Sequence, residues 1–156
     1  MYVIRVASTS TECDNVFALR HAVFVTEQGV PAALERDEHD DVADHFIAYD
    51  GDRADRAVGA GRLAVEPAGF EGADPELGPV GHLGRLAVLP EARGAGLGAA
   101  LVQAIEERAR DRGLAVMVLS SQTYAIGFYE RLGYAAHGPE FDDAGLPHRW
   151  MTRRLG

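Results

Sequence analysis

The sequence predicts a single α/β domain (α+β mixed) in which helices cover a mixed β-sheet. The chain has 156 residues, which is enough for one continuous hydrophobic core. Hydrophobic residues make up 47% and charged residues 25% of it, a balance typical of globular rather than disordered proteins. The apolar pattern alternates between the periods of strands and helices in the order βα, ββ, βαβαββ. No repeat or linker divides residues 1–156, so we expect one domain over the whole sequence.

The first half of the chain predicts one helix among three strands. The expected elements are a strand at 2–7, a helix at about 12–27, and strands at 45–49 and 57–65. Hydroxyl residues between Ser8 and Thr11 can cap the helix. The turn-rich residues 50–53 join the last two strands. Residues 29–44 are expected to be a polar connection, and residues 66–79, with three prolines and three glycines, a long loop.

The second half predicts alternating strands and helices and a final strand pair. The expected elements are a strand at 82–89, a helix at about 95–112, a strand at 114–119, a helix at 123–132, and strands at 134–137 and 147–154. Pro90 ends the first of these strands, and Gly113 ends the long helix. The strand at 114–119 is almost wholly apolar, as expected when a strand is covered on both faces. A turn over residues 142–145 separates the last two strands.

Charge and cysteine content exclude several classes of function. The 15 basic residues face 24 acidic ones, and a net charge of −9 is unfavourable for binding a nucleic-acid backbone. The single cysteine, Cys13, cannot form an internal disulfide or a metal cluster, which suits a reducing compartment. No apolar stretch approaches ~18 residues, and the first ten residues lack a signal-peptide pattern. We therefore expect a cytoplasmic protein that binds neither metal, nucleic acid nor membrane.

An unusual helix start gives the strongest chemical signal. The first amides of a helix have no intrahelical acceptor and are usually capped by Ser, Thr, Asp or Asn. None of these four residue types occurs between Arg85 and Arg110. Glycines stand instead at 94, 96 and 98, beside the cation of Arg93. Free amides, the positive helix end and this arginine together predict an anion site, most simply for phosphate.

Two common nucleotide-binding motifs do not fit this site. Gly94-x-Gly96-x-x-Ala99 resembles a dinucleotide-binding turn, but that turn needs an acid at the end of the next strand. Here the strand ends Val118-Leu-Ser-Ser-Gln122 without one. A Walker-type loop needs a lysine, and the chain has none.

Leu86-Ala-Val88 followed by Arg93-Gly-Ala-Gly-Leu-Gly98 resembles the acyl-CoA signature of the GNAT superfamily of N-acetyltransferases. Phe128-Tyr-Glu-Arg-Leu-Gly-Tyr134 resembles the second marker of that family, and the two motifs lie in the family's order and at its usual separation. Further stretches resemble its small bacterial ElaA-like branch. These are Arg20 to Gln28, Glu35 to Asp41 with His45, and Gly145 to Met151.

The resemblance implies a GNAT-type fold, with a mixed, mostly antiparallel sheet of six or seven strands that splays after the 82–89 strand. It implies acetyl-CoA as co-substrate, paired with the backbone of that strand and cradled by the glycine-rich turn. Gln122 stands where many members have an asparagine, and it can still bond a cofactor amide. The residues expected to hold acetyl-CoA are Leu86, Ala87, Val88, Arg93, Gly94, Ala95, Gly96, Leu97, Gly98, Ala99 and Gln122.

The resemblance also implies catalytic roles. Tyr129 would donate a proton to the departing thiolate, and a phenol of pKa ~10 is protonated at neutral pH. A core position with a satisfied hydroxyl is the alternative for this tyrosine. His82 lies where some relatives carry a glutamate base; a histidine of pKa ~6.5 could serve, as could an ordered water. His45 and His148 are weaker candidates, expected to be core or hydrogen-bonding histidines.

The acceptor is expected to be a primary amine of a small molecule or a peptide, which the sequence does not identify. Six carboxylates between Glu35 and Asp44 suggest either a solvated loop or an attractor for a cationic amine. Arg20, followed by Val-Phe and downstream acids, also resembles acyl-homoserine-lactone synthases, and a non-catalytic acyl-CoA-binding module is a further alternative. Many members of the family are dimers, so a homodimer is compatible with the resemblance, although no motif marks an interface.

Overall fold

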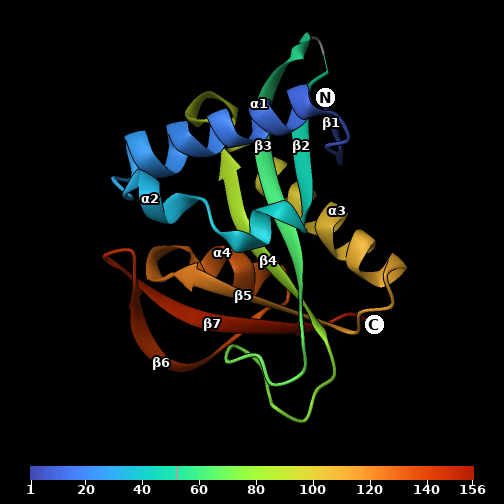
Figure 1. Cartoon of the computed structure of the whole chain (residues 1–156), viewed down its shortest axis with the longest axis vertical. Helices are drawn as coiled ribbons and strands as arrows, with labels where there is room; N and C mark the ends of the chain where they lie inside the picture. The colour runs from blue at the N-terminus through green and yellow to red at the C-terminus, as the bar shows by residue number, and fades with distance from the viewer. Residues whose placement is uncertain (52) are drawn as a thin grey trace.

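The computed structural model describes residues 1–51 and 53–156, and in them seven strands form one sheet (Figure 1). The strands follow the order β1-β2-β3-β4-β5-β7-β6, and every neighbouring pair is antiparallel except β4 and β5. The predicted class and the mostly antiparallel sheet are therefore confirmed. The strands are β1 (Tyr2–Val6), β2 (Asp44–Asp50), β3 (Arg53–Glu66), β4 (Val80–Val88), β5 (Val116–Gln122), β6 (Ala135–Asp143) and β7 (Leu146–Arg154).

In the described residues, four α-helices and four π- or 3-10-helical segments connect these strands. The α-helices are α1 (Ser10–Arg20), α2 (Ala32–Glu35), α3 (Leu97–Asp111) and α4 (Ile126–Arg131). The other segments are the π-helical η1 (His21–Glu27) and the 3-10 turns η2 (Glu38–Asp41), η3 (Pro90–Ala92) and η4 (Thr123–Ala125). Within the described residues, every helix is too short or too polar to cross a bilayer.

Local chemistry explains most boundaries. The Thr9 hydroxyl accepts a hydrogen bond from the Glu12 amide at 3.1 Å and so caps α1, and α1 with η1 spans the single predicted helix. The hairpin between β6 and β7 turns at Ala144 and Gly145, whose φ angles are 54° and 83°. This tight turn makes both strands longer than predicted. The predicted turn at 50–53 includes residue 52, which lies outside the described residues.

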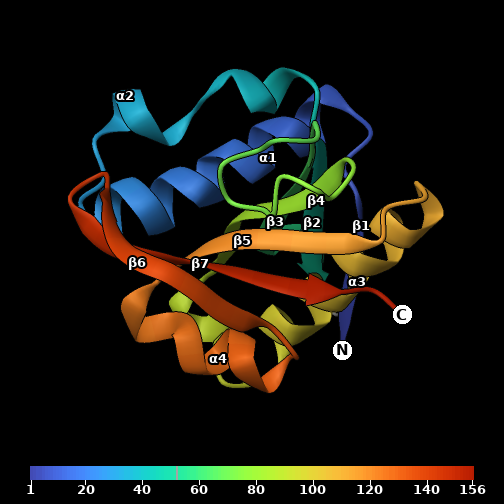
Figure 2. The same cartoon turned by 90° about the horizontal axis from the view of Figure 1, so that it is seen from below.

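Helices cover both faces of the sheet, as predicted, and its central strands are buried. On one face, Ile47 of β2 packs with Val16 and Leu19 of α1. On the other, Ala48 packs with Leu101 of α3. Figure 2 shows the sheet between α1 on one side and α3 with α4 on the other. Because neighbouring strand residues point to opposite faces, each central strand contributes to two hydrophobic clusters.

Strands β4 and β5 separate soon after they meet. Their parallel pairing consists of Gly81 with Met117 and His82 with Val118. Beyond His82, β4 is hydrogen-bonded to β3 alone among the described strands. A bulge interrupts β4 where Arg85 has a φ of 53°, the left-handed region that a side chain seldom occupies. The splay and the bulge open a gap in the sheet that the functional site uses.

The connection at 29–44 is more ordered than predicted. It forms α2 and η2, and it buries Glu35 and most of Asp40 against Arg20. The prediction failed because the partners of these acids lie elsewhere in the sequence. A charge run gives no indication of arginines on distant strands.

Candidate functional site

A cavity of about 1080 Å³ lies between the separated strands β4 and β5 and extends from the start of α3 to the 66–79 loop. It brings together most of the predicted site residues. Those that line it are His82, Leu86, Val88, Arg93, Gly94, Gly96, Leu97, Gly98, Ala99, Gln122 and Tyr129. Ala87 points away into the cluster beneath α1, and Ala95 is exposed outside the cavity. Their side chains therefore take no part in the lining.

The start of α3 offers free amides, as predicted. No side chain caps the helix, and Gly96 occupies the N-cap position with a φ of 82°. The first amide with a backbone acceptor in this turn is that of Ala100, which donates to the carbonyl of Gly96 at 3.0 Å. A Cβ added at Gly94 or Gly96 would meet nothing within 4 Å, so the turn faces open space. This end of the cavity thus presents about one helical turn of backbone amides without intrahelical acceptors.

Arg93 lies at this site but is already paired. Its guanidinium donates to both carboxylate oxygens of Glu27, at 2.8 and 2.7 Å, and its Nε donates to the Val88 carbonyl at 2.9 Å. This pairing raises the pKa of Arg93 and lowers the pKa of Glu27. Because the pair is about 40% exposed on each side, it is weakly held, and an anion at the α3 amides can compete with Glu27.

Tyr129 of α4 is buried in the hydrophobic core. Its exposed fraction is 9%, and it packs against Phe128 and Tyr134 with ring centroids 4.9 and 6.0 Å apart. Phe128, one residue earlier, is only partly buried. Burial raises the pKa of the Tyr129 phenol well above its usual value. In the described residues its hydroxyl has no hydrogen-bond partner, so Tyr129 is not a core tyrosine with a satisfied hydroxyl, and the residue lines the cavity.

His82 sits at the point where β4 and β5 separate, with a side chain 16% exposed. Burial, together with the nearby cations of Arg62 and Arg85, lowers its pKa to about 4. The sequence suggested an ordinary histidine pKa, so this is a correction. The imidazole stays neutral at pH 7, but it is a weak proton acceptor. His45 is a hydrogen-bonding core histidine, as predicted: its Nε2 lies 2.9 Å from the Asp40 carbonyl.

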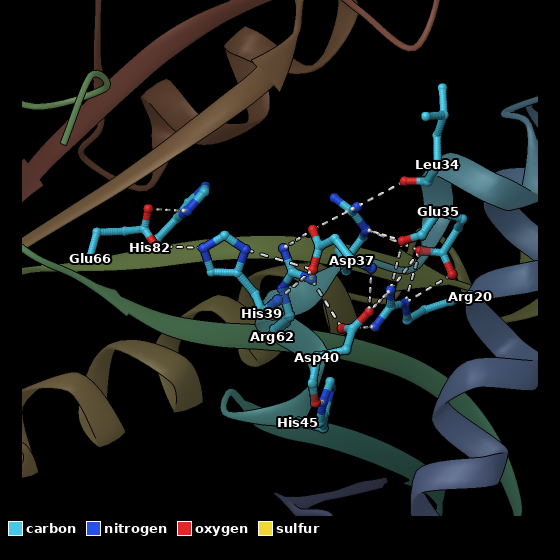
Figure 3. A network of polar contacts seen from close by, with 11 residues as sticks. Arg20, Leu34, Glu35, Asp37, His39, Asp40, His45, Arg62, Glu66 and His82 are labelled. Atoms are coloured by element: carbon cyan, nitrogen blue, oxygen red, sulfur yellow. Dashed lines mark hydrogen bonds and ion pairs between the residues drawn. The ribbon is translucent and has the colours of Figure 1, made fainter.

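The acidic stretch is held by three arginines rather than left free to attract a cation (Figure 3). Arg20, only 1% exposed, pairs with Glu35 and with Asp40, each at 2.7 Å. Arg62 of β3 pairs with Asp37 and Asp40, at 2.7 and 3.0 Å. Arg85 of the β4 bulge pairs with Glu35 and Asp37, at 3.0 and 3.2 Å. Glu35, Asp37 and Asp40 are therefore neutralised by arginines within the protein, which counts against their acting as an attractor.

The cavity also contains residues that the sequence did not point to. Glu66 ends β3 beside His39 of η2 and His82 of β4, and aromatic rings from the 66–79 loop and from β6 and β7 line the same region. The rings are Phe70, Phe141 and Trp150. Only the hairpin register and the loop path bring these side chains together, so no local motif could have revealed them.

Residues 7–155 match a family model described as "Acetyltransferase (GNAT) domain". The chain belongs to the GNAT acetyltransferase family. It is 36% identical to the Bacillus subtilis (strain 168) protein named "Uncharacterized N-acetyltransferase YjcF", over 95% of this chain and 96% of that one. An acyl-CoA N-acyltransferase structure from Pseudomonas aeruginosa superposes with a TM-score of 0.78 at 28% identity, and covers 98% of both chains.

Escherichia coli ElaA has the same fold, with a TM-score of 0.75 at 23% identity over 98% of both chains. The expected family and the resemblance to ElaA are thus confirmed. Membership makes the protein an acyltransferase. In this chain the gap in the sheet and the uncapped start of α3 open into one cavity.

Proposed function

We propose that this protein is an N-acetyltransferase in which a primary amine attacks acetyl-CoA directly while both substrates are bound in a ternary complex. We also propose that residues 1–156 form its single catalytic domain. The observation that supports the proposal most is the joining of three features in one cavity: the uncapped start of α3, the unpaired edge of β4 and the hydroxyl of Tyr129. A donor such as acetyl-CoA matches these features: its pyrophosphate matches the start of α3, its long amide-bearing arm matches the edge of β4, and its thioester matches Tyr129.

Acetyl-CoA fits the residues that line the cavity. The amides of the α3 turn are free to receive pyrophosphate oxygens, since a Cβ at Gly94 or Gly96 would enter empty space. The edge of β4 from Leu86 to Val88 can hydrogen-bond the amides of the pantetheine arm as a neighbouring strand would. The side-chain amide of Gln122 donates to Gln28 at 2.9 Å, and its oxygen can still accept from the arm.

Within this proposal, Tyr129 protonates the departing thiolate. A thiol of pKa ~8.5 leaves more readily when it is protonated, and the buried phenol keeps its proton at every physiological pH. His82, neutral but weakly basic, can accept a hydrogen bond from the amine and orient it. Because its pKa is about 4, an ordered water or a nearby carboxylate is better suited to remove the proton.

Similar proteins suggest the range of acceptors. A Trypanosoma brucei brucei protein named "Glucosamine 6-phosphate N-acetyltransferase" is 38% identical over 53% of this chain. An aminoglycoside 6'-N-acetyltransferase known in complex with coenzyme A shares the fold, with a TM-score of 0.69 at 19% identity. For this chain we propose an amine of a small molecule or a peptide. We also propose a cytoplasmic location, and a homodimer as the assembly to test by light scattering.

The proposal is tested by calorimetry with coenzyme A and by thiol release from acetyl-CoA over a panel of amines. Binding together with amine-dependent thiol release supports it. Binding without turnover on any amine favours a non-catalytic acyl-CoA-binding module. Absence of binding, or conversion of an acylated homoserine precursor to a lactone in preference to amine acetylation, contradicts it.

A further inference from the structure

At the end of the cavity where β3 ends, Glu66 provides a carboxylate that no arginine of the described residues pairs with. Arg20, Arg62 and Arg85 face the three carboxylates of Glu35, Asp37 and Asp40, and these six side chains balance in charge. Glu66 stands outside this balance. Among the described residues, no arginine pairs with it, although its side chain is only 7% exposed.

Two imidazoles are the partners of Glu66 (Figure 3). Nε2 of His39 donates to Oε1 at 2.7 Å, since an ionised carboxylate can only accept. Nδ1 of His82 lies 3.8 Å from Oε2, too far for a hydrogen bond, and is buried without another partner. Within the described part of the chain, Oε2 therefore receives no hydrogen bond. A carboxylate oxygen in this state, on a side chain that is only 7% exposed, favours an added donor, preferably a charged one.

The walls around this oxygen are flat and aromatic. Phe70 lies 5.1 Å from the His82 ring and 5.3 Å from Trp150, and Trp150 lies 5.4 Å from Phe141, all measured between ring centroids. His82 and Trp150 are themselves 6.1 Å apart. Aromatic faces beside one carboxylate attract an organic cation, and their extent also accommodates a planar apolar group.

We infer that this region binds the acceptor, and that the acceptor is a primary monoamine carrying a planar apolar group, with its ammonium on Oε2 of Glu66. The inference rests on the proposed acetyl transfer. The amine enters as an ammonium and gives one N–H proton to Glu66. The nitrogen lone pair of the neutral amine then bonds to the thioester carbonyl carbon, the carbon–sulfur bond breaks, and the thiolate takes the proton of Tyr129. The acetylated nitrogen loses its second proton, which restores the phenol of Tyr129 through solvent, and Glu66 releases the first proton to solvent.

The same features disfavour other amines. An amino acid would bring its own carboxylate toward Glu66, which repels it. A polyamine or an aminoglycoside has no planar apolar group for the rings, and Glu35, Asp37 and Asp40, already paired with arginines, offer its second cation no free partner. The remaining titratable groups on the cavity wall near Glu66 are His39, Glu71, His82, Asp142, Asp143 and His148.

The test uses 2-phenylethylamine as acceptor, with phenylalanine and spermidine as comparison amines, at saturating acetyl-CoA. We expect kcat/KM to be at least about 10-fold higher for 2-phenylethylamine than for either of the others. Glu66→Gln should lower kcat/KM for 2-phenylethylamine about 10- to 100-fold, the range of a lost charged hydrogen bond. Its KM for acetyl-CoA should not change, and Glu66→Asp should recover part of the loss. Glu71→Gln is the matched control, because Glu71 lines the same cavity but is exposed.

The outcomes separate the inference from the proposed function. If the wild-type protein acetylates amines but Glu66→Gln behaves like Glu71→Gln, or if phenylalanine or spermidine is preferred, the inference is wrong and the proposed function stands. If 2-phenylethylamine binds the wild-type protein but not Glu66→Gln in calorimetry, and no amine is acetylated, the acceptor site is supported and the proposed function is wrong. If neither acetyl-CoA nor 2-phenylethylamine binds, both are overturned.

Discussion

The two ends of the cavity are built in different ways. The end at α3 presents main-chain amides, and its geometry depends on glycines within a few residues of one another. The end at Glu66 is made of side chains from β3, β4, η2 and β7, held by ion pairs between residues 15 to 50 positions apart. The first is local in sequence, so it can be recognised from a motif. The second depends on the tertiary fold, so no local motif reveals it.

The largest expected effect tests whether ion pairs stabilise the end of the cavity at Glu66, which we call the acceptor end because we propose that the acceptor binds there. Arg20→Ala removes a guanidinium that is 1% exposed and leaves Glu35 and Asp40 buried without it. Breaking a buried ion pair in this way should lower the free energy of unfolding by about 3–5 kcal/mol. Urea denaturation followed by circular dichroism measures the loss.

Arg110→Ala is the control for this prediction, because Arg110 is exposed on α3 and has no ion-pair partner among the described residues. It should change the free energy of unfolding by less than about 0.5 kcal/mol. A loss below about 1 kcal/mol in Arg20→Ala would show that the arginine network contributes little to stability, and the contrast between the two ends would then fail.

The next effect concerns the residue between the two ends. Tyr129→Phe removes a hydroxyl that has no partner in the described protein and faces the cavity. Loss of a general acid should lower kcat about 10²- to 10⁴-fold, with the KM values for both substrates nearly unchanged. Thiol-release kinetics measure this. Tyr124→Phe, at an exposed tyrosine on the same cavity, should leave kcat unchanged; equal losses in both variants would count against an acid role.

A smaller effect is expected on the affinity for coenzyme A at the α3 end of the cavity, where main-chain amides are presented. Gly96→Ala places a Cβ in a turn with a φ of 82°, at the position where we propose that the pyrophosphate binds. We expect the dissociation constant for coenzyme A, measured by calorimetry, to rise about 10-fold, equivalent to ~1.4 kcal/mol.

Gly69→Ala provides the matched control for backbone strain. Gly69 has a φ of 89° in the 66–79 loop and is equally open to solvent. Both variants should therefore lose similar stability, about 1 kcal/mol. Unchanged affinity in Gly96→Ala would mean that the anion lies elsewhere.

The uncapped start of α3 and the order of strands and helices along the chain could be predicted from the sequence, for physical reasons. Missing caps and clustered glycines between Arg85 and Arg110 are local facts, and strand and helix periods are local too. The acceptor end was mostly missed. Glu35 can be buried because Arg20 and Arg85, which come from two other elements, pair with it. Glu66 has no arginine partner because Arg62, on the same strand, pairs with Asp37 and Asp40 instead. The pKa of His82 was also mispredicted, because burial and neighbouring arginines act through space.

The smallest expected effect concerns His82 and the pH dependence of the free energy of unfolding. A histidine whose pKa falls from 6.5 to about 4 on folding is protonated more readily in the unfolded chain. Its contribution to stability is therefore complete above pH 6.5 and declines as the pH falls toward 4. Between pH 7 and pH 5.5 the free energy of unfolding should drop by about 1 kcal/mol through this group. His82→Gln should remove that part of the drop, whereas His137→Gln, at an exposed histidine of β6, should not. An identical pH dependence in the wild-type protein and His82→Gln would show that the imidazole is not kept neutral by burial, and it would restore His82 as a base at neutral pH.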